Sequence, residues 1–147
     1  MAKFEAKGID EMMQELNALE VEEIAPKMLE ESVPILEEAV KIEVGKHEDT
    51  GDMYESIRTT KANRNKNGYY ICVRPTGYAS LKKWKNSRKK RRGAKRERVR
   101  NMEKLVYLEY GTSRQTARPV LTRAVNKAEG AVVRKMQEVF DREVDAM

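Results

Sequence analysis

Cysteine and histidine are almost absent from this chain. Of its 147 residues, Cys72 is the single cysteine and His47 the single histidine. A disulfide framework, a zinc finger, a Cys-His nucleophile pair and a Ser-His-Asp triad each need several such residues, so these sites lack most of their parts. We therefore expect an intracellular chain, in which Cys72 packs as a small buried hydrophobe.

Long apolar runs are also missing. The longest, Tyr69-Tyr70-Ile71-Cys72-Val73, has five residues, far short of the ~20 that a membrane-spanning helix needs. The pattern of a signal peptide is not present either, so we expect no membrane association.

The motifs of common catalytic sites are missing as well. The eight glycines are dispersed, without a Gly-x-Gly or Gly-Lys-Ser/Thr phosphate-binding sequence. The cluster His47-Glu48-Asp49 with Asp52 lacks the ligand spacing of a metal site. The adjacent carboxylates Glu37 and Glu38 are expected on a solvated helix face, without a cleft for glycosidase chemistry. The sequence predicts a protein that is not an enzyme and has no cofactor.

Charge is plentiful but unevenly distributed. Residues 1–56 hold 16 acidic and 5 basic side chains, whereas residues 82–100 hold 12 Lys/Arg and the single acid Glu97. The formal net charge of +6 therefore comes from one basic segment inserted at about residues 79–104, because the rest of the chain is net acidic. Its candidate contact residues are Lys82, Lys83, Lys85, Arg88, Lys89, Lys90, Arg91, Arg92, Lys95, Arg96, Arg98 and Arg100.

The density of charge in this segment predicts a solvated loop, because its run Arg88-Lys89-Lys90-Arg91-Arg92 has no apolar partner at helical or strand spacing and is followed by Gly93. Three interpretations remain open. The loop could be a surface feature without a partner, it could bind the phosphates of a nucleic acid, or it could bind an acidic patch on another subunit. Trp84 would serve to stack on bases if the chain were a small cytoplasmic nucleic-acid-binding protein.

Periodicity and turn residues predict the elements of the first half. Residues 3–7 alternate as a short strand. Two consecutive helices, or one kinked helix, are expected from about residue 9 to residue 46, interrupted by Pro26 and Pro34. Strands at 56–61 and 69–74 flank a loop that ends in Asn67-Gly68, which is typical of an antiparallel hairpin.

The second half predicts a strand at 105–110 and a long helix that begins near Pro119 and runs to the end. The length suits one domain, residues 1–147. We expect the α+β class: a mostly antiparallel sheet of about four strands packed against a kinked N-terminal helix pair and a long C-terminal helix.

Three motifs, in order, carry a resemblance to a known family. They are Gly8-Ile9-Asp10, then the run from Thr50 and Gly51 to Ser56-Ile57, and then Tyr107-Leu108-Glu109-Tyr110-Gly111-Thr112 followed by Ala117-Arg118-Pro119-Val120. In these the chain resembles the tail-completion and head–tail joining (neck) proteins of long-tailed bacteriophages, akin to the minor tail protein Z of phage lambda. Two features depart from the family pattern: Val120 replaces an aromatic residue, and the basic insertion is longer and more charged.

The resemblance implies a structural virion protein in the neck or at the head-proximal end of the tail, made in the host cytoplasm. It implies a ring-forming homo-oligomer, a hexamer, through which DNA passes, flanked by head-closure or neck proteins and by tail-terminator or tail-tube proteins. The basic loop would contact genomic DNA non-specifically or a neighbouring ring. The motif residues to which it draws attention are Thr50, Gly51, Glu109, Gly111, Thr112, Arg118 and Pro119.

Individual residues of the motif have physical interpretations of their own. Gly111 is expected to supply a backbone angle that other residues avoid, and Thr112 to hydrogen-bond the turn. Glu109 interrupts an apolar run. It is expected either to point to solvent by strand alternation or to pair with an arginine such as Arg114 or Arg118, of its own or of a neighbouring subunit.

Overall fold

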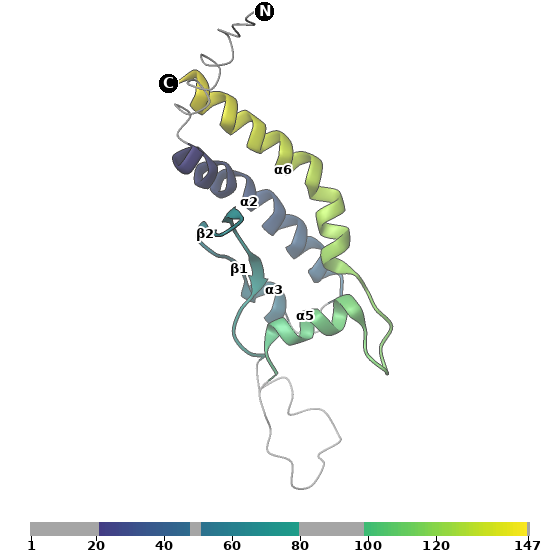
Figure 1. Ribbon diagram of the computed structural model, residues 1–147. Coiled ribbons are helices and arrows are strands. Elements are labelled where there is room, and N and C mark those ends of the chain that lie inside the picture. The colour runs from purple at the N-terminus through teal and green to yellow at the C-terminus, as the bar shows by residue number, and fades with distance from the viewer. Residues whose placement is uncertain (1–20, 48–50, 80–98, 147) are drawn as a thin grey trace, which may run out of the picture.

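The computed structural model describes residues 21–47, 51–79 and 99–146, and the helices and strands below belong to these ranges (Figure 1). The predicted strand at 3–7 and the first part of the predicted helical region lie outside them. The elements, in chain order, are α2 (Val21–Gly45), α3 (Asp52–Ser56), β1 (Ile57–Thr59), β2 (Asn63–Asn65), β3 (Gly68–Tyr70), β4 (Val73–Pro75), α5 (Asn101–Tyr110) and α6 (Val120–Asp145).

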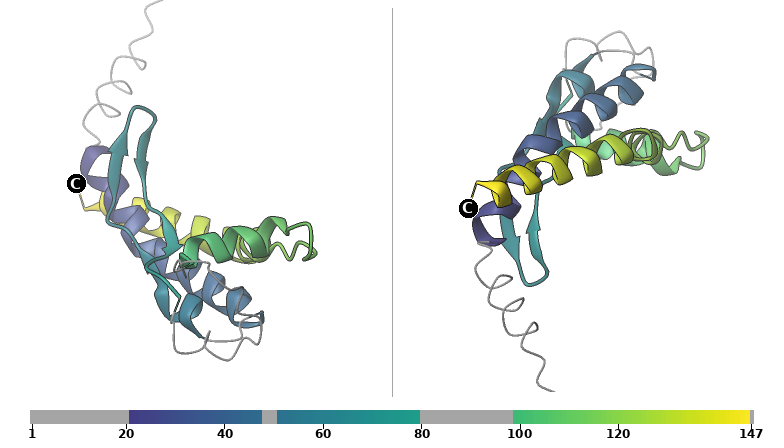
Figure 2. Two further views of the ribbon diagram at one scale, coloured as in Figure 1. Left: turned by 90° about the horizontal axis from the view of Figure 1, so that it is seen from below. Right: turned by 90° about the horizontal axis from the view of Figure 1, so that it is seen from above.

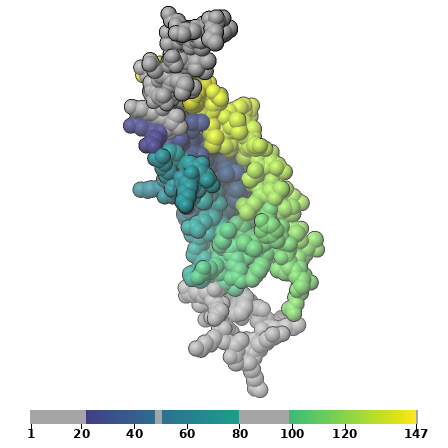
Figure 3. All heavy atoms as spheres, viewed as in Figure 1, coloured from purple at the N-terminus to yellow at the C-terminus, as the bar shows by residue number. Residues whose placement is uncertain are grey.

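Helices α2 and α6 form an antiparallel pair, which is the most extensive packing between two elements of the fold (Figure 1). Ion pairs join opposite ends of the two helices, with Lys27 Nζ 2.5 Å from a Glu143 oxygen and Glu43 bound to Lys127. The strands lie on the other side of α2, so that α2 is the middle layer (Figure 2). On the face seen in Figure 3, the middle of α2 is visible as a dark blue strip between the strands and α6.

Both prolines lie inside α2, which is one helix from Val21 to Gly45. A proline lacks the N–H that would bond the carbonyl four residues earlier, which here belongs to Glu22 for Pro26 and to Glu30 for Pro34. Glu22 and Glu30 are exposed, so water can satisfy those carbonyls. Of the two arrangements predicted, the described residues therefore show the single helix, not a break into two at either proline.

The predicted hairpin is present, and its strand pairing extends into the residues that were expected to form the loop. β1 pairs antiparallel with β4, and β2 pairs with β3, where Asn65 lies opposite Gly68. The Asn-rich stretch that the sequence assigns to the loop thus contributes β2, and only two residues remain at the turn. Gly68 has a φ of 124°, a conformation that glycine adopts readily.

The predicted strand at 105–110 is wrong, because these residues form the second half of helix α5. Asn101, Leu105, Leu108 and Glu109 are the buried residues of α5, and their spacing of four, three and one follows a helical face. The remaining apolar side chains of the run lie on the opposite face of the helix. Apolar residues on both faces give the continuous run that resembles a buried strand.

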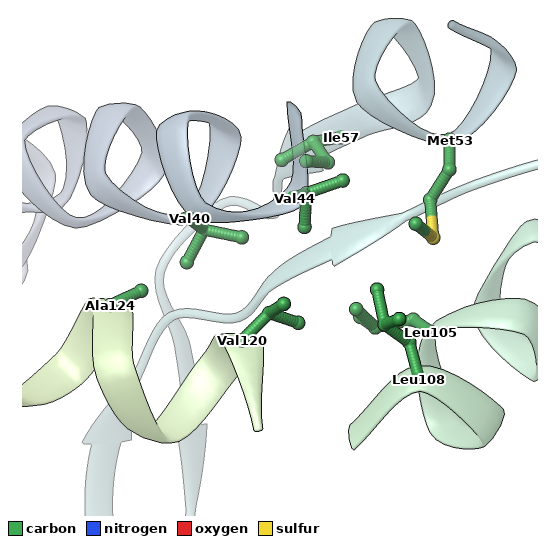
Figure 4. Close-up of a cluster of buried hydrophobic side chains, with 8 residues drawn as sticks. All are labelled: Val40, Val44, Met53, Ile57, Leu105, Leu108, Val120 and Ala124. Atoms are coloured by element: carbon green, nitrogen blue, oxygen red, sulfur yellow. The ribbon is translucent and has the colours of Figure 1, made fainter. Parts of the chain in front are cut away.

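The hydrophobic core lies where the end of α2 meets α3, β1, α5 and the start of α6 (Figure 4). Each buried aliphatic side chain of this kind contributes about 1.5–3 kcal/mol to the free energy of folding. The core residues are Val40, Val44, Met53, Ile57, Leu105, Leu108, Val120 and Ala124.

The α+β class is confirmed, with four antiparallel strands in two pairs and a long C-terminal helix. The prediction for Cys72 is wrong: it is exposed, because the run that contains it alternates in a two-stranded ribbon rather than lying in a covered sheet. Among the described residues, none of the helices combines the length and apolar character of a membrane span.

Candidate functional site

The basic segment leaves and re-enters the described fold at adjacent residues. Its cations from Lys82 to Arg98 lie outside the described residues, and Arg100 is the one that lies within them. Tyr78 and Arg100 form an antiparallel bridge, and the Ala79 N–H donates to the Val99 carbonyl at 3.0 Å. The Arg100 guanidinium lies 5.9 Å from the centre of the Tyr78 ring, a cation–π distance. The two ends of the segment are thereby paired.

Asn101 fixes this paired base to the rest of the protein. Its side chain is buried, and its Nδ2 donates to the Thr76 carbonyl at 2.8 Å, while its backbone N–H donates to the Gly77 carbonyl at 3.0 Å. Because Asn101 is also the first residue of α5, the base of the basic segment and the start of this helix are held together.

Glu109 caps helix α6. It does not point to solvent, and within the described residues it forms no ion pair with Arg114 or Arg118, whereas a pairing with an arginine of a neighbouring subunit stays a prediction. It is buried, one carboxylate oxygen accepts the Leu121 N–H at 2.8 Å, and the other accepts the Thr122 N–H at 3.2 Å and the Thr122 hydroxyl at 2.6 Å. The N-cap position of α6 is occupied by Pro119, whose side chain supplies no acceptor. A carboxylate from α5 therefore satisfies N–H groups that the first helical turn leaves free, and its charge complements the helix dipole.

The turn that follows α5 needs glycine at its first position. Gly111 has a φ of 76°, and a Cβ built there would lie 2.7 Å from the Ala117 nitrogen and 2.8 Å from the Gln115 carbonyl oxygen. The predicted role of Thr112 is confirmed: it exchanges backbone hydrogen bonds with Gln115, and its hydroxyl accepts the Arg114 N–H at 3.3 Å. The turn is held by its own hydrogen bonds and protrudes at one end of the molecule (Figure 2).

Arg118 and Pro119 complete the same turn. The Arg118 N–H donates to the Leu108 carbonyl at 2.7 Å, which holds the end of the turn against α5, and the Arg118 side chain is exposed. Pro119 directly precedes α6. Val120, at the position where the resembled family has an aromatic residue, is fully buried in the core.

The Thr50-Gly51 motif is only partly described, because Thr50 lies outside the described residues. Gly51 has a φ of 77°, and its carbonyl accepts the Glu55 N–H at 2.9 Å at the start of α3. Met53 and Ile57, which belong to the same motif, are both core residues. The described part of the motif therefore forms a turn at Gly51 and attaches it to the hydrophobic core through Met53 and Ile57, which is a structural role.

The outward face of α5 is apolar. Met102, Val106 and Tyr110 are 42%, 40% and 78% exposed and lie four residues apart on one side of the helix, with Tyr107 beside them. The only charged residue of α5 classed as exposed is Glu103, whose carboxylate accepts a hydrogen bond from the Tyr107 hydroxyl. A helix that is apolar on both faces is normally covered on both. We call Met102, Val106, Tyr107 and Tyr110 the α5 ridge.

A shallow hollow of about 230 Å³ lies between α2 and α6, on the surface of the helix pair. Its apolar lining consists of Ile35, Ala39 and Ile42 from α2 and of the small residues Ala128 and Ala131 from α6, and Ile42 is 54% exposed. We call the apolar lining of this hollow, Ile35, Ala39, Ile42, Ala128 and Ala131, the α2/α6 groove.

Glu43 joins α2 to α6 beside the groove. Its side chain is 2% exposed, and it binds Lys46 at 2.6 Å and also Lys127 of α6. Hydrogen bonds from these two ammonium groups lower the pKa of Glu43 from 4.5 to about 2. The pKa of Lys127 is raised by the same contact. Glu43 is therefore a charged structural link, and the sequence analysis did not single it out.

Within residues 21–47, 51–79 and 99–146, no group of histidine, cysteine or carboxylate side chains converges as a metal site would require. Of the residues that the sequence singles out, Glu109, Gly111, Thr112, Arg118 and Pro119 are brought together in the capped turn at 109–122, and Arg100 lies in the paired base at 76–101. Comparison with known proteins gives no match to a family model, to a curated protein or to a solved structure.

Proposed function

We propose that this chain is a structural subunit of a phage particle, a tail-completion or head–tail joining protein that assembles as a ring in the neck or at the head-proximal end of the tail. It carries out no reaction. The proposal combines the motif resemblance with the surface of the folded subunit, and DNA would pass through the ring.

The observation that carries the assembly role is the exposed α5 ridge. This helix of ten residues exposes four large apolar side chains, Met102, Val106, Tyr107 and Tyr110, on its outer face. Contiguous exposed apolar surface of this kind marks a protein–protein contact. The α2/α6 groove lies on different elements, so one chain has two unlike apolar surfaces. Unlike surfaces are what a ring with head-to-tail contacts requires.

The motif residues of the resemblance support the same role. Glu109, Gly111 and Arg118 build a turn directly after the ridge that is held by hydrogen bonds and close backbone contacts. Rigid presentation of an exposed turn lowers the entropy that association must overcome.

The test is the size of the purified full-length chain. Sedimentation velocity and electron microscopy should find closed particles with one subunit number, alone or after mixing with tails or heads that lack this protein. Solitary subunits under all these conditions would contradict the proposal.

The alternative, a small cytoplasmic nucleic-acid-binding protein, rests on the basic segment and its paired base. It predicts a monomer with strong affinity for duplex or single-stranded nucleic acid. The same sedimentation experiment, with and without DNA, separates the two functions, because only the alternative gives a monomer whose mass changes with DNA alone.

A further inference from the structure

The α5 ridge and the α2/α6 groove match each other in form. On the ridge, Met102, Val106 and Tyr110 span eight residues, or ~12 Å of helix, and on the groove Ile35 to Ile42 spans seven, or ~10 Å. The ridge is convex, with Tyr110 78% exposed. The groove is concave, because the alanines Ala128 and Ala131 form its α6 side. A row of side chains spaced by four residues packs into a groove between two such rows.

The charges around the two surfaces differ in sign on balance. Around the ridge, three arginines outnumber the one exposed acid of α5, Glu103. In the hollow, Lys127 is bound to Glu43, which leaves the carboxylate of Glu38. Arg100 precedes the ridge, and Arg114 and Arg118 follow it in the exposed turn. Among the described residues, the side chains of Arg114 and Arg118 make no ion pair. On the groove side, the carboxylate of Glu38 lines the hollow, is exposed and also has no ion-pair partner within the described ranges. Opposite charges around matching apolar surfaces favour one mutual orientation.

We propose that the α5 ridge of one copy of this chain docks into the α2/α6 groove of the next copy. The ridge and groove are on different elements of the same chain, so each copy uses its ridge toward one neighbour and its groove toward the other. This inference rests on the proposed ring assembly and assigns its contact surfaces. The contact is heterologous, so it closes a ring if the rotation between copies permits.

A trapping experiment tests the direction of the contact. Val106→Glu places a charge on the ridge and leaves the groove intact, and Ile42→Glu does the reverse. Each variant alone should self-associate at least about tenfold more weakly than the unmodified chain, since each has one damaged surface. Mixed in equal amounts, the two variants should form dimers and no larger species, because only the intact ridge of one can meet the intact groove of the other.

Val133→Glu is the matched control. Val133 is 57% exposed on α6 and does not line the groove, so this variant should assemble as the unmodified chain does. Circular dichroism of all three variants checks that the helices remain. A mixture that stays monomeric would overturn the inference, as would a Val133→Glu variant that is as weak as the other two.

Cross-linking gives an answer that does not depend on damaging a surface. In a Cys72→Ser background, Val106→Cys and Ile42→Cys proteins are mixed and oxidised. Disulfide-linked heterodimers are expected, and each protein alone should remain unlinked. Val106→Cys homodimers would instead mean that two ridges face each other. Rings seen by microscopy without the heterodimer would overturn the ridge-and-groove contact and leave the ring intact, whereas monomers alone would contradict both.

Discussion

At the scale of single residues, a buried carboxylate sets where the last helix begins. Glu109 lies at the end of α5, and it accepts the N–H groups of Leu121 and Thr122 at the start of α6. The chain between these points reverses direction through the turn that begins at Gly111. Glu109 therefore joins two helices across the turn, in place of the serine or aspartate that caps many helices locally.

Replacing Glu109 with alanine should destabilise the protein by about 1–2 kcal/mol, because two N–H groups and the Thr122 hydroxyl lose their acceptor. Glu109→Gln keeps one carbonyl acceptor and should cost less. Urea unfolding followed by circular dichroism measures both. Glu129→Ala is the control, since Glu129 is an exposed carboxylate in the middle of α6 with no hydrogen bond or ion pair in the described structure. Equal losses for Glu109→Ala and Glu129→Ala would refute the capping role.

Replacing Gly111 or Gly130 by alanine should change the free energy of unfolding in opposite directions. At Gly111, with its positive φ, a methyl group would meet the backbone of Ala117 at 2.7 Å, so Gly111→Ala should lower the free energy of unfolding by roughly 1–3 kcal/mol. At Gly130, inside α6, nothing lies within 4 Å of the added carbon. Gly130→Ala should therefore stabilise by about 0.5–1 kcal/mol. The same urea titration measures both, and a destabilised Gly130→Ala would contradict this assignment.

Residues whose role depends on distant contacts were the hardest to predict from sequence. Gly111 and Thr112 act within their own turn, and both predictions were correct. Glu109 contacts residues 12 and 13 positions away, and local spacing offers no sign of that contact. Cys72 was expected to be buried because its neighbours are apolar, but a two-stranded ribbon leaves every second side chain exposed.

At the scale of elements, α5 shows why periodicity failed. A half-buried helix reveals itself by polar residues on its outer face. In α5 the outer face holds Met102, Val106 and Tyr107, so the run around Leu105 is continuous and resembles a covered strand. The residues that hide the helix from sequence analysis are therefore the same residues that form the ridge. Helix α6 has many charged residues on its outer face, and its extent was predicted correctly from Val120 onward.

The ion pair between Glu43 of α2 and Lys127 of α6 makes the stability of the protein depend on pH. The pKa of Glu43 is lowered from 4.5 to about 2 in the folded protein by its hydrogen bonds to Lys127 and Lys46. A carboxyl whose pKa is lower when folded stabilises the protein above its unfolded pKa, and that stabilisation is lost as the pH falls through the folded pKa. The contribution of Glu43 should therefore be complete above about pH 5 and decline toward pH 2.

Glu43→Gln tests this dependence. The difference in unfolding midpoint between the variant and the unmodified chain should be largest near neutral pH and should shrink between pH 4.5 and pH 2. Glu129→Gln, which makes the same substitution at an exposed position of α6, is the control variant. A difference that is constant over this range would show that the Glu43 charge does not stabilise the helix pair.

At the scale of the whole molecule, the sequence concentrates 12 of its 30 lysines and arginines in one segment, residues 82–100. If residues 88–92 contact DNA in a ring channel, changing all five cations Arg88, Lys89, Lys90, Arg91 and Arg92 to glutamine should weaken duplex binding and flatten its dependence on salt. Each lost phosphate contact reduces the slope of log K against log salt by about 0.9. Fluorescence anisotropy at several salt concentrations measures this slope. An unchanged slope would favour an acidic protein surface as the partner of the segment.

The residues that flank the basic segment on its two sides are paired with each other. Ala79 and Val99 are hydrogen-bonded neighbours, and Asn101 ties the pair to Thr76 and Gly77. Replacing residues 80–98 by a short turn should therefore preserve the Tyr78–Arg100 bridge and the start of α5. The length and the sign of charge of this stretch can then change without loss of the hydrogen bonds that hold its two ends.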